Sequence, residues 1–219
     1  MTGTTALLNV EDVSYLRNGE RYLHPVSLTL NAGESLFLTG PSGCGKSTLL
    51  KIIASLLPAS TGSVSFRGNP VESMKAEIYR RHVSYCFQSP LLFADTVFDN
   101  LAFPWLIRHK TVSRKTLIEW LQRVNLSADI LDRGIEHLSG GERQRIGLLR
   151  NLQFLPDILL LDEVTSALDK ENQQRVNHLI EHLVAEQGLA VIRVSHHTDE
   201  IAQAARTITL QPSHQDTLT

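Results

Sequence analysis

The chain has 219 residues, of which 42% are hydrophobic and 20% charged, and its formal net charge is −2. This balance does not favour a nucleic-acid partner, which usually meets a basic face, and the two cysteines are too few for a disulfide framework, which indicates a reducing compartment. The apolar runs fall well short of the roughly 20 residues that cross a bilayer, and the first residues lack a signal-peptide pattern, so we expect a cytoplasmic chain with no membrane span.

The first third of the chain predicts strands. The runs "ALLNVEDVSYL", "RYLHPVSLTL" and "ESLFLTG" are separated by the pairs Asn18-Gly19 and Ala32-Gly33, and asparagine and glycine are usual residues of tight turns. Two shorter runs, "SVSFRG" and "HVSYCF", follow further along and are also strand candidates.

A complete P-loop pattern, "GPSGCGKST", lies between the third run and a helical segment, which is the context that the motif requires. Its glycines let backbone N–H groups turn toward a phosphate, and the start of the helix adds a favourable potential. Lys46 is expected to reach the β- and γ-phosphates, and Ser47 to bind Mg²⁺. The residues expected to bind the nucleotide are Gly40, Pro41, Ser42, Gly43, Cys44, Gly45, Lys46, Ser47 and Thr48. A glycine-rich turn that only caps a helix explains less, because the full pattern and its context coincide.

The middle third changes to a helical pattern, from about 99 to 154. Apolar residues recur at helical spacing over 117–124, and Ser139 with Glu142 forms a capping box at a second helix start. The last third returns to alternating strand and helix, with an amphipathic stretch at 176–184 between the apolar runs "DILLLDE" and "LAVIRVSHH", and a short last run, "TITLQ". The whole pattern predicts an α/β core that is interrupted by a helical insertion.

A second functional pattern stands at the end of an apolar run. "DILLLDE" is typical of a buried parallel strand, and it ends in Asp162 and Glu163. Adjacent carboxylates at a strand end are costly unless cations neutralise them. We therefore expect Asp162 to hold the Mg²⁺ shell and Glu163 to polarise the attacking water. An acidic surface turn fits poorly directly after an apolar run.

Six motifs occur in order along the chain: "GPSGCGKST", "CFQSP", "LSGGERQR", "ILLLDE", "SALD" and "VSHH". Together they resemble the nucleotide-binding subunit of ABC transporters over essentially the whole chain. The resemblance implies an α/β fold of the P-loop NTPase class, with a RecA-like core, an N-terminal antiparallel β portion and an inserted α-helical subdomain. It implies one ABC ATPase domain over 1–219, with the core at about 1–88 and 155–212 and the helical subdomain at about 89–154.

The stretch "LSGGERQR" offers a phosphate the same kinds of group as a P-loop, but without the lysine. Ser139 and the N–H groups of Gly140 and Gly141, at a capped helix start, present donors to a γ-phosphate. Taken alone, the stretch is equally an ordinary helix cap. The resemblance implies that two copies of the chain pack head to tail, and that each signature closes over the ATP held by Lys46 and the P-loop of the other copy.

The resemblance also implies roles for residues that their own surroundings do not single out. Gln88 is the glutamine that senses Mg²⁺ and the attacking water, Asp169 lies in the loop that communicates across the dimer, and His196 contacts the γ-phosphate. Arg17 stands where an aromatic residue usually stacks on adenine. Because an arginine also stacks on a base, the adenine contact is expected at Arg17 or at the nearby Tyr22.

The resemblance implies an ATP-hydrolysing subunit that lies on the cytoplasmic face of the inner membrane, dimerises around two MgATP and drives an integral membrane permease. The segment "IYRRHVSYCFQSPLLFADTVFDNLAFPW" is most similar to the branch assigned to iron export. A rival from another class is a soluble ABC ATPase in a cytosolic assembly such as an iron–sulfur scaffold. A single-chain P-loop kinase is a third interpretation, although such an enzyme has no use for "LSGGE".

An aromatic-rich stretch, with Phe93, Phe98, Phe103 and Trp105, follows Gln88. Such side chains suit a surface that grips a short helix of another protein. They also suit the core of a helical insertion, and we expect about half of them to lie there.

Overall fold

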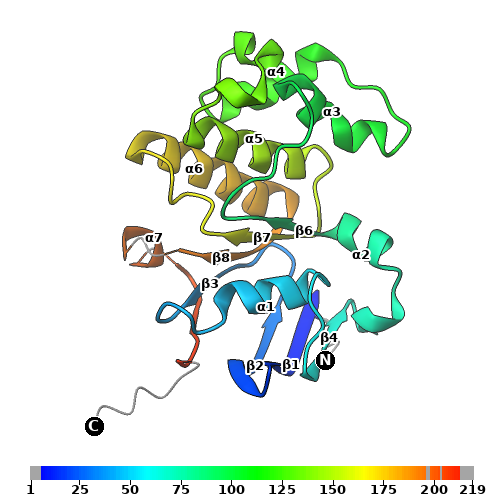
Figure 1. The fold of residues 1–219 in the computed structure, drawn as a ribbon, viewed down its shortest axis with the longest axis vertical. Coiled ribbons are helices and arrows are strands. Elements are labelled where there is room, and N and C mark those ends of the chain that lie inside the picture. Colours follow the sequence, from blue (N-terminus) through cyan, green and yellow to red (C-terminus); the bar gives the residue numbers. More distant parts are fainter. Residues whose placement is uncertain (1–5, 196–197, 203, 213–219) are drawn as a thin grey trace.

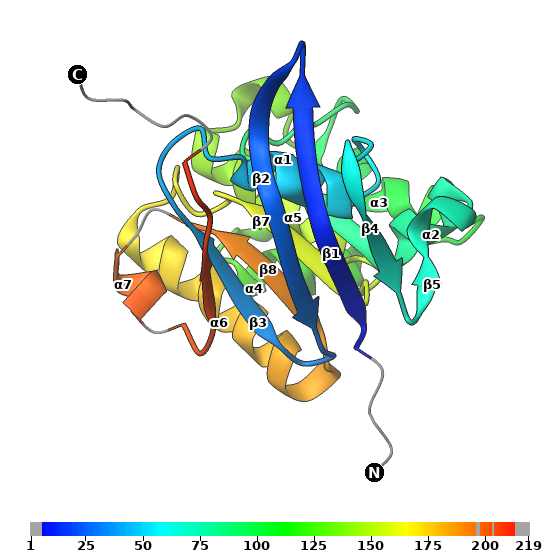
Figure 2. The same cartoon turned by 90° about the horizontal axis from the view of Figure 1, so that it is seen from below.

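A computed structural model describes residues 6–195, 198–202 and 204–212 of the chain. Two sheets and the helices around them are stacked in layers, as Figures 1 and 2 show from two directions. The antiparallel sheet lies at the bottom of Figure 1 and faces the viewer in Figure 2.

The antiparallel sheet has the strand order β2-β1-β4-β5. Its strands are β1 (Leu8–Arg17), β2 (Glu20–Leu30), β4 (Thr61–Phe66) and β5 (Asn69–Pro70). Asn18 and Gly19 join β1 to β2 with φ angles of 52° and 83°. Two successive left-handed residues are the usual two-residue connection of a hairpin, because their twist matches that of the strands.

The second sheet is parallel and has the strand order β6-β7-β8-β3-β9. Its strands are β3 (Ser35–Thr39), β6 (Val83–Cys86), β7 (Ile158–Asp162), β8 (Ala190–Val194) and β9 (Thr207–Thr209). Because the strands are parallel, the carboxyl ends of β3, β6 and β7 lie along one edge, where open α/β sheets bind their ligands. The segments that leave these three strands carry the P-loop, Gln88 and Glu163.

Helices cover both faces of the parallel sheet. They are α1 (Lys46–Ile53), α2 (Ala76–His82), α3 (Val97–Leu106), α4 (Arg114–Arg123), α5 (Gly140–Leu152), α6 (Lys170–Gln187) and α7 (Thr198–Ala202). Short 3₁₀ turns occur at Val71–Ser73, Ala128–Asp132 and Ile135–His137. In Figure 1, α1 lies between the two sheets, α5 and α6 lie on the opposite face of the parallel sheet, and α3 and α4 lie beyond them.

The parallel sheet separates two hydrophobic clusters. Along β7, Ile158 and Leu160 belong to the cluster that contains α1 and the antiparallel sheet, whereas Leu159 and Leu161 belong to the cluster formed with helices α3 to α6. All four are at most 2% exposed, as expected for a strand that is covered on both faces. This alternation fixes the register of β7 and so places Asp162 at its carboxyl end.

The predicted fold class is confirmed: the chain has a parallel α/β core, an antiparallel β portion and inserted helices. The capping box expected at Ser139 and Glu142 is also present. The sequence does not predict α2, because Tyr79 is its one buried residue, and a helix with one buried position shows no apolar periodicity. No helix among the described residues is long and apolar enough to span a membrane.

Candidate active site

The P-loop connects the end of β3 to the start of α1. Three of its glycines have left-handed φ angles, 134° at Gly40, 79° at Gly43 and 94° at Gly45. A Cβ at Gly45 would lie 2.5 Å from the carbonyl oxygen of Tyr22, and a Cβ at Gly40 would lie 2.7 Å from that of Leu210. The loop therefore requires glycine both for its backbone conformation and for its contact with neighbouring backbone.

Lys46 is the first residue of α1, and its ammonium group lies inside the P-loop. Nζ donates to the carbonyl oxygens of Gly40 at 2.8 Å and Pro41 at 3.0 Å, and the residue is 6% exposed. Ser42 and Gly43, by contrast, are exposed at the surface of the loop. A buried ammonium group at a helix N-terminus makes the centre of the loop positive, which is what phosphate oxygens require.

The P-loop meets the end of β7 at Ser47 and Asp162. The Ser47 hydroxyl donates to Asp162 Oδ1 at 2.9 Å, and the hydroxyl of Tyr85, on β6, donates to Asp162 Oδ2 at 2.5 Å. Asp162 is 4% exposed, and the ion pairs found in the described part of the chain do not include it. The two side chains that hold this carboxylate are hydroxyls, so they bring no positive charge that would compete with a bound cation.

These oxygen atoms fit a Mg²⁺ ion. Mg²⁺ takes oxygen ligands, and it is usually bound by one or two carboxylates together with the phosphates of the substrate rather than by a cage of protein groups. Asp162 and Ser47 supply a carboxylate and a hydroxyl directly beside the phosphate loop. A divalent cation placed there would offset the negative charge of both the carboxylate and the phosphates.

Glu163 occupies a strained turn directly after β7. Its φ angle is 52°, a left-handed value that is uncommon outside glycine and that often marks functional sites. Its N–H donates to the carbonyl oxygen of Val194 at 3.1 Å, and Gln88 Nε2 donates to Glu163 Oε2 at 2.7 Å. The structure therefore brings together Gln88 and Glu163, which lie 75 residues apart in the sequence.

The loop that carries Gln88 rests on α5. A Cβ at Gly147, in the middle of that helix, would lie 2.7 Å from Pro90 Cβ, and Gln144 Nε2 donates to the carbonyl oxygen of Phe87 at 3.5 Å. Because the contact at Gly147 leaves no space for a side chain, the loop and the helix are in direct contact.

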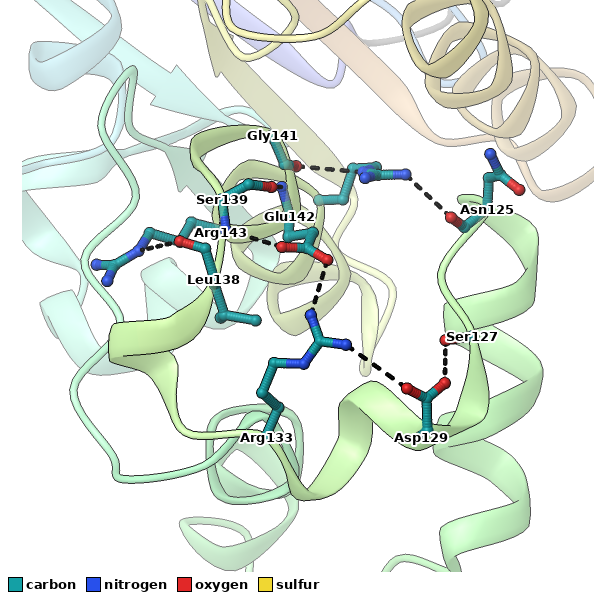
Figure 3. A network of polar contacts seen from close by, with 10 residues as sticks. Asn125, Ser127, Asp129, Arg133, Leu138, Ser139, Gly141, Glu142 and Arg143 are labelled. Atoms are coloured by element: carbon teal, nitrogen blue, oxygen red, sulfur yellow. Dashed lines mark hydrogen bonds and ion pairs between the residues drawn. The ribbon is translucent and has the colours of Figure 1, made fainter.

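The signature begins α5 with a complete capping box, drawn in Figure 3. Ser139 Oγ accepts a hydrogen bond from the Glu142 N–H at 3.2 Å, and Glu142 Oε2 accepts one from the Ser139 N–H at 2.7 Å. Ser139 and Gly140 are exposed, and a Cβ at Gly140 would meet no atom within 4 Å. Within the described residues, the hydrogen bonds of the signature do not reach the P-loop, and Figure 1 places α5 and α1 on opposite faces of the parallel sheet.

Arg133 supports this helix cap from outside α5. Its guanidinium lies 3.1 Å from Glu142 Oε1 and 3.5 Å from Asp129 Oδ2, and Figure 3 shows it between the two acids. Burial disfavours the charged form of Glu142, but hydrogen bonds from Ser139 and the charges of Arg133 and Arg145 outweigh it and hold the pKa of Glu142 below its ordinary value. The cap therefore contains an ionised carboxylate at neutral pH.

The start of α6 is linked to the signature through hydrogen bonds. Asp169 caps α6, since its Oδ1 accepts from the Asn172 N–H at 2.9 Å and its Oδ2 accepts from Asn172 Nδ2 at 2.7 Å. Arg145, on α5, donates from Nη1 to Asn172 Oδ1 at 2.7 Å and from Nε to the carbonyl oxygen of Gly141 at 3.2 Å. The side chains of Asn172 and Arg145 thus connect Asp169 to Gly141.

The other residues predicted for the site are Tyr22, Arg17 and His196. Tyr22, on β2, has its carbonyl oxygen against Gly45 of the P-loop and is 37% exposed. Arg17 is exposed at the end of the β1–β2 hairpin, where it is paired with Glu20. His196 lies outside the described residues.

Three residues that support this site are not assigned by the sequence: Tyr85, Arg133 and Arg145. Tyr85 belongs to a short apolar run that predicts only a strand, and its partner Asp162 is 77 residues away. Arg145 is part of "LSGGERQR", so the motif marks its position but not its contact with Asn172. No local pattern marks Arg133.

A phosphate loop beside strand-end carboxylates, on a parallel α/β sheet, defines a P-loop nucleoside triphosphatase. The ABC transporter family matches residues 23–166 of the chain. The chain is 50% identical over 212 residues to the "Probable iron export ATP-binding protein FetA" of Escherichia coli K12, an alignment that covers 97% of this chain and 94% of that protein. It is 39% identical over 197 residues to the sulfate/thiosulfate import ATP-binding protein CysA of Bordetella parapertussis, of which it spans 55%.

Two solved structures have a similar fold. The ATP-binding cassette MJ0796, in a dimeric post-hydrolysis state bound to ADP and Pi, has a TM-score of 0.85 and 27% identity, over 95% of this chain and 96% of that one. A bacterial Atm1-family ABC exporter with ATP bound has a TM-score of 0.86 and 24% identity, over 97% of this chain and 38% of that one. The chain belongs to the ABC transporter family, and it is an ATP-binding, ABC-type ATPase.

Proposed function

We propose that the chain is the ATP-hydrolysing subunit of a membrane ABC transporter, that two copies dimerise around two MgATP, and that the dimer drives a separate permease for the export of iron or another metal. One observation carries this proposal: Asp162 lies beside the P-loop and is followed by Glu163, whereas the signature at Ser139 and Gly140 is exposed and, in the described part of the chain, makes no hydrogen bond to the P-loop. We interpret the two regions as the two halves of a nucleotide site that a second copy brings together. The name of FetA supports iron export, and the dimeric state of the MJ0796 structure supports pairing.

The residues of the site act by position and charge. Lys46 and the N–H groups of the P-loop bind the β- and γ-phosphates. Ser47, Asp162 and Gln88 would hold Mg²⁺, which neutralises phosphate charge when it is bound. Glu163, held by Gln88, orients a water molecule and draws its proton as the water oxygen attacks the γ-phosphorus. The bond from that phosphorus to the β–γ bridging oxygen then breaks, leaving ADP and phosphate.

The second copy completes each site. Ser139 and the N–H groups of Gly140 and Gly141 approach the γ-phosphate of the ATP bound by the partner, and loss of that phosphate after hydrolysis weakens the dimer. Further proposed contacts come from Asp169 across the dimer, from His196 to the γ-phosphate, and from Arg17 or Tyr22 to adenine.

A groove near the Gln88 loop supports a permease partner. It has a volume of about 360 Å³ and is lined in part by Phe93, Phe103 and Phe154. Phe93 is 55% exposed, and its ring meets that of Phe103 edge to face at 4.7 Å. Phe98 instead packs against the helical cluster, and the Trp105 ring lies 4.7 Å from that of Phe154. The aromatic side chains are therefore divided between the helical core and a surface groove that suits a short helix.

The same groove carries an excess of positive charge. Arg80, Arg81, Arg108 and Arg150 line it together with one acid, Glu77. Burial and the nearby charge of Arg81 lower the pKa of Arg108, and the ion pairs found in the described part of the chain include none of the four arginines. We propose that the permease segment carries carboxylates that offset these charges.

This partner gives the chain its proposed place, on the cytoplasmic face of the inner membrane and attached through the permease. We also propose that the chain has two parts, a core of about 1–88 and 155–212 and a helical subdomain of about 89–154. Residues of both parts line the groove, so a segment bound there would contact both.

A soluble ABC ATPase in a cytosolic assembly remains the rival interpretation of the function. Affinity purification from solubilised membranes distinguishes the two, since a multi-span membrane protein supports transport and only soluble partners support the rival.

The test of the catalytic proposal is Glu163→Gln. With ATP and Mg²⁺ this variant should lose nearly all turnover, because an amide cannot take the proton of the attacking water. It should form a stable dimer, because the γ-phosphate is retained. Size-exclusion chromatography with light scattering and a phosphate-release assay measure both results. A variant that hydrolyses ATP normally as a monomer contradicts the proposal.

A further inference from the structure

We propose that Tyr85 is a positioning residue for Asp162: its hydroxyl holds the Asp162 carboxylate in the orientation that binds a divalent cation. This inference rests on the proposed function, because it takes Asp162 as the residue that binds the cation accompanying ATP. It concerns a residue outside the P-loop and outside the six sequence motifs that define the site.

The geometry of the parallel sheet brings the two side chains together. Tyr85 on β6 is paired with Leu160 on β7, so Asp162 lies two residues further toward the carboxyl edge. The tyrosine side chain spans this offset, and its hydroxyl meets Asp162 Oδ2 at 2.5 Å, a length typical of a hydrogen bond to a charged acceptor. Tyr85 is 8% exposed, and its ring lies edge to face on that of Phe87 at 4.7 Å. The donor is therefore held in place by packing.

Asp162 needs such a donor in order to keep one orientation. The terminal torsion of an aspartate is broad, so hydrogen bonds decide where its two oxygens point. Oδ1 accepts from Ser47, which is itself a proposed cation ligand, and among the side chains that the structure describes Tyr85 is the donor to Asp162 from outside the phosphate loop. Because a phenol is neutral, Tyr85 fixes the carboxylate without reducing the charge that attracts the cation. Removing groups that orient a metal ligand in this way typically weakens metal binding by about 10–100-fold.

Tyr79 provides a matched control. It is 0% exposed, and its hydroxyl donates to the carbonyl oxygen of Ile53 at 2.7 Å. Tyr79→Phe and Tyr85→Phe each remove one buried hydroxyl and leave one acceptor with a donor fewer, so both lower stability in a similar way. Tyr85→Phe alone removes a donor to Asp162.

The experiment measures ATP binding rather than turnover. In the Glu163→Gln background, the dissociation constant of a fluorescent ATP analogue is determined with EDTA and with excess Mg²⁺, and the ratio of the two constants gives the contribution of the cation. Tyr85→Phe should leave the EDTA value unchanged and reduce the ratio by about tenfold. Tyr79→Phe should leave both unchanged, and thermal unfolding of both variants compares their stability.

The possible results of this titration contradict different parts of the proposal. A Tyr85→Phe ratio equal to that of the parent overturns the positioning role, as does an equal loss in Tyr79→Phe, which would mark a general effect of stability. If Tyr85→Phe does not fold, Tyr85→Met fills the same apolar space without a donor, and it should show the same tenfold loss; a normal ratio there overturns the proposal equally. If the parent itself shows no effect of Mg²⁺, the proposed cation site fails, and the positioning role of Tyr85, which rests on it, fails with it.

Discussion

Gly140→Ala should raise the stability of the isolated chain and, at the same time, interfere with the nucleotide site of the proposed dimer. Gly140 is the first residue of α5, and a Cβ there would meet no atom within 4 Å. Alanine is favoured over glycine within a helix by about 0.5–1 kcal/mol. In a chain of this length, each 1 kcal/mol shifts Tm by about 2–4 °C. The isolated variant should therefore unfold about 1–4 °C above the native chain, as measured by calorimetry at a fixed protein concentration without nucleotide.

The same methyl group should nevertheless impair ATP turnover and ATP-dependent dimerisation. In the proposed dimer it would occupy the space in which the γ-phosphate of the partner's ATP approaches the signature. We expect ATP turnover to fall by at least about tenfold, which corresponds to 1.4 kcal/mol in the barrier, and the ATP-dependent dimer of Glu163→Gln to be lost when the two substitutions are combined. Phosphate release and light scattering measure these effects.

A second glycine of the same helix provides the contrast. At Gly147 an added Cβ would lie 2.7 Å from Pro90 Cβ, so Gly147→Ala should lower Tm instead of raising it. Normal turnover together with an ATP-dependent dimer in Gly140→Ala would show that the signature does not face a phosphate, and the reasoning would then be wrong.

Lys46→Ala should weaken ATP binding by at least about tenfold in a fluorescence titration, because it removes the buried cation of the P-loop; unchanged affinity would place the phosphates elsewhere. Arg81→Glu should prevent recovery of the permease from solubilised membranes, whereas the exposed Arg123→Glu should not, and equal recovery would exclude the groove as the docking site. The folded pKa of Glu142 is lowered from 4.5, so its contribution to stability is complete above about pH 4.5 and is lost as the pH falls through the folded value. In Glu142→Gln, Tm should therefore fall less steeply on acidification than in the native chain. A fall in Tm of the same steepness would show that the ionised Glu142 does not stabilise the helix cap.

The sequence predicts much of this fold because its signals are local. In β7, the residues from Ile158 to Leu161 form a continuous apolar run that acidic residues bound on both sides, so the position of this strand follows from a few neighbouring residues. The helix α2 is not predicted because its residues around Tyr79 are mostly polar, and its contact with the core becomes visible only in three dimensions. The short α7 is not predicted for the same reason, because Asp199 and Glu200 give no apolar pattern.

The residues of the candidate site also differ in how well the sequence predicts their positions. Gly40 to Thr48 form one continuous motif whose backbone conformation follows from its glycines, so its position between β3 and α1 is readily predicted. The bond from Tyr85 to Asp162 joins two strands that are far apart in the sequence, and its existence depends on the register between β6 and β7. The bond from Arg133 to Glu142 depends on a turn whose path no periodicity describes.

The length of helix α5 connects the signature to the proposed docking groove. Its 13 residues form a rod about 20 Å long, with the signature at one end, the Gly147 contact with the Gln88 loop in the middle, and Arg150 in the wall of the groove near the other end. We expect a rod of this length to transmit a tilt, so that a displacement of its first turn reaches the wall of the groove. The contact at Gly147 places the loop that carries Gln88, whose side chain is bonded to Glu163, between these two ends.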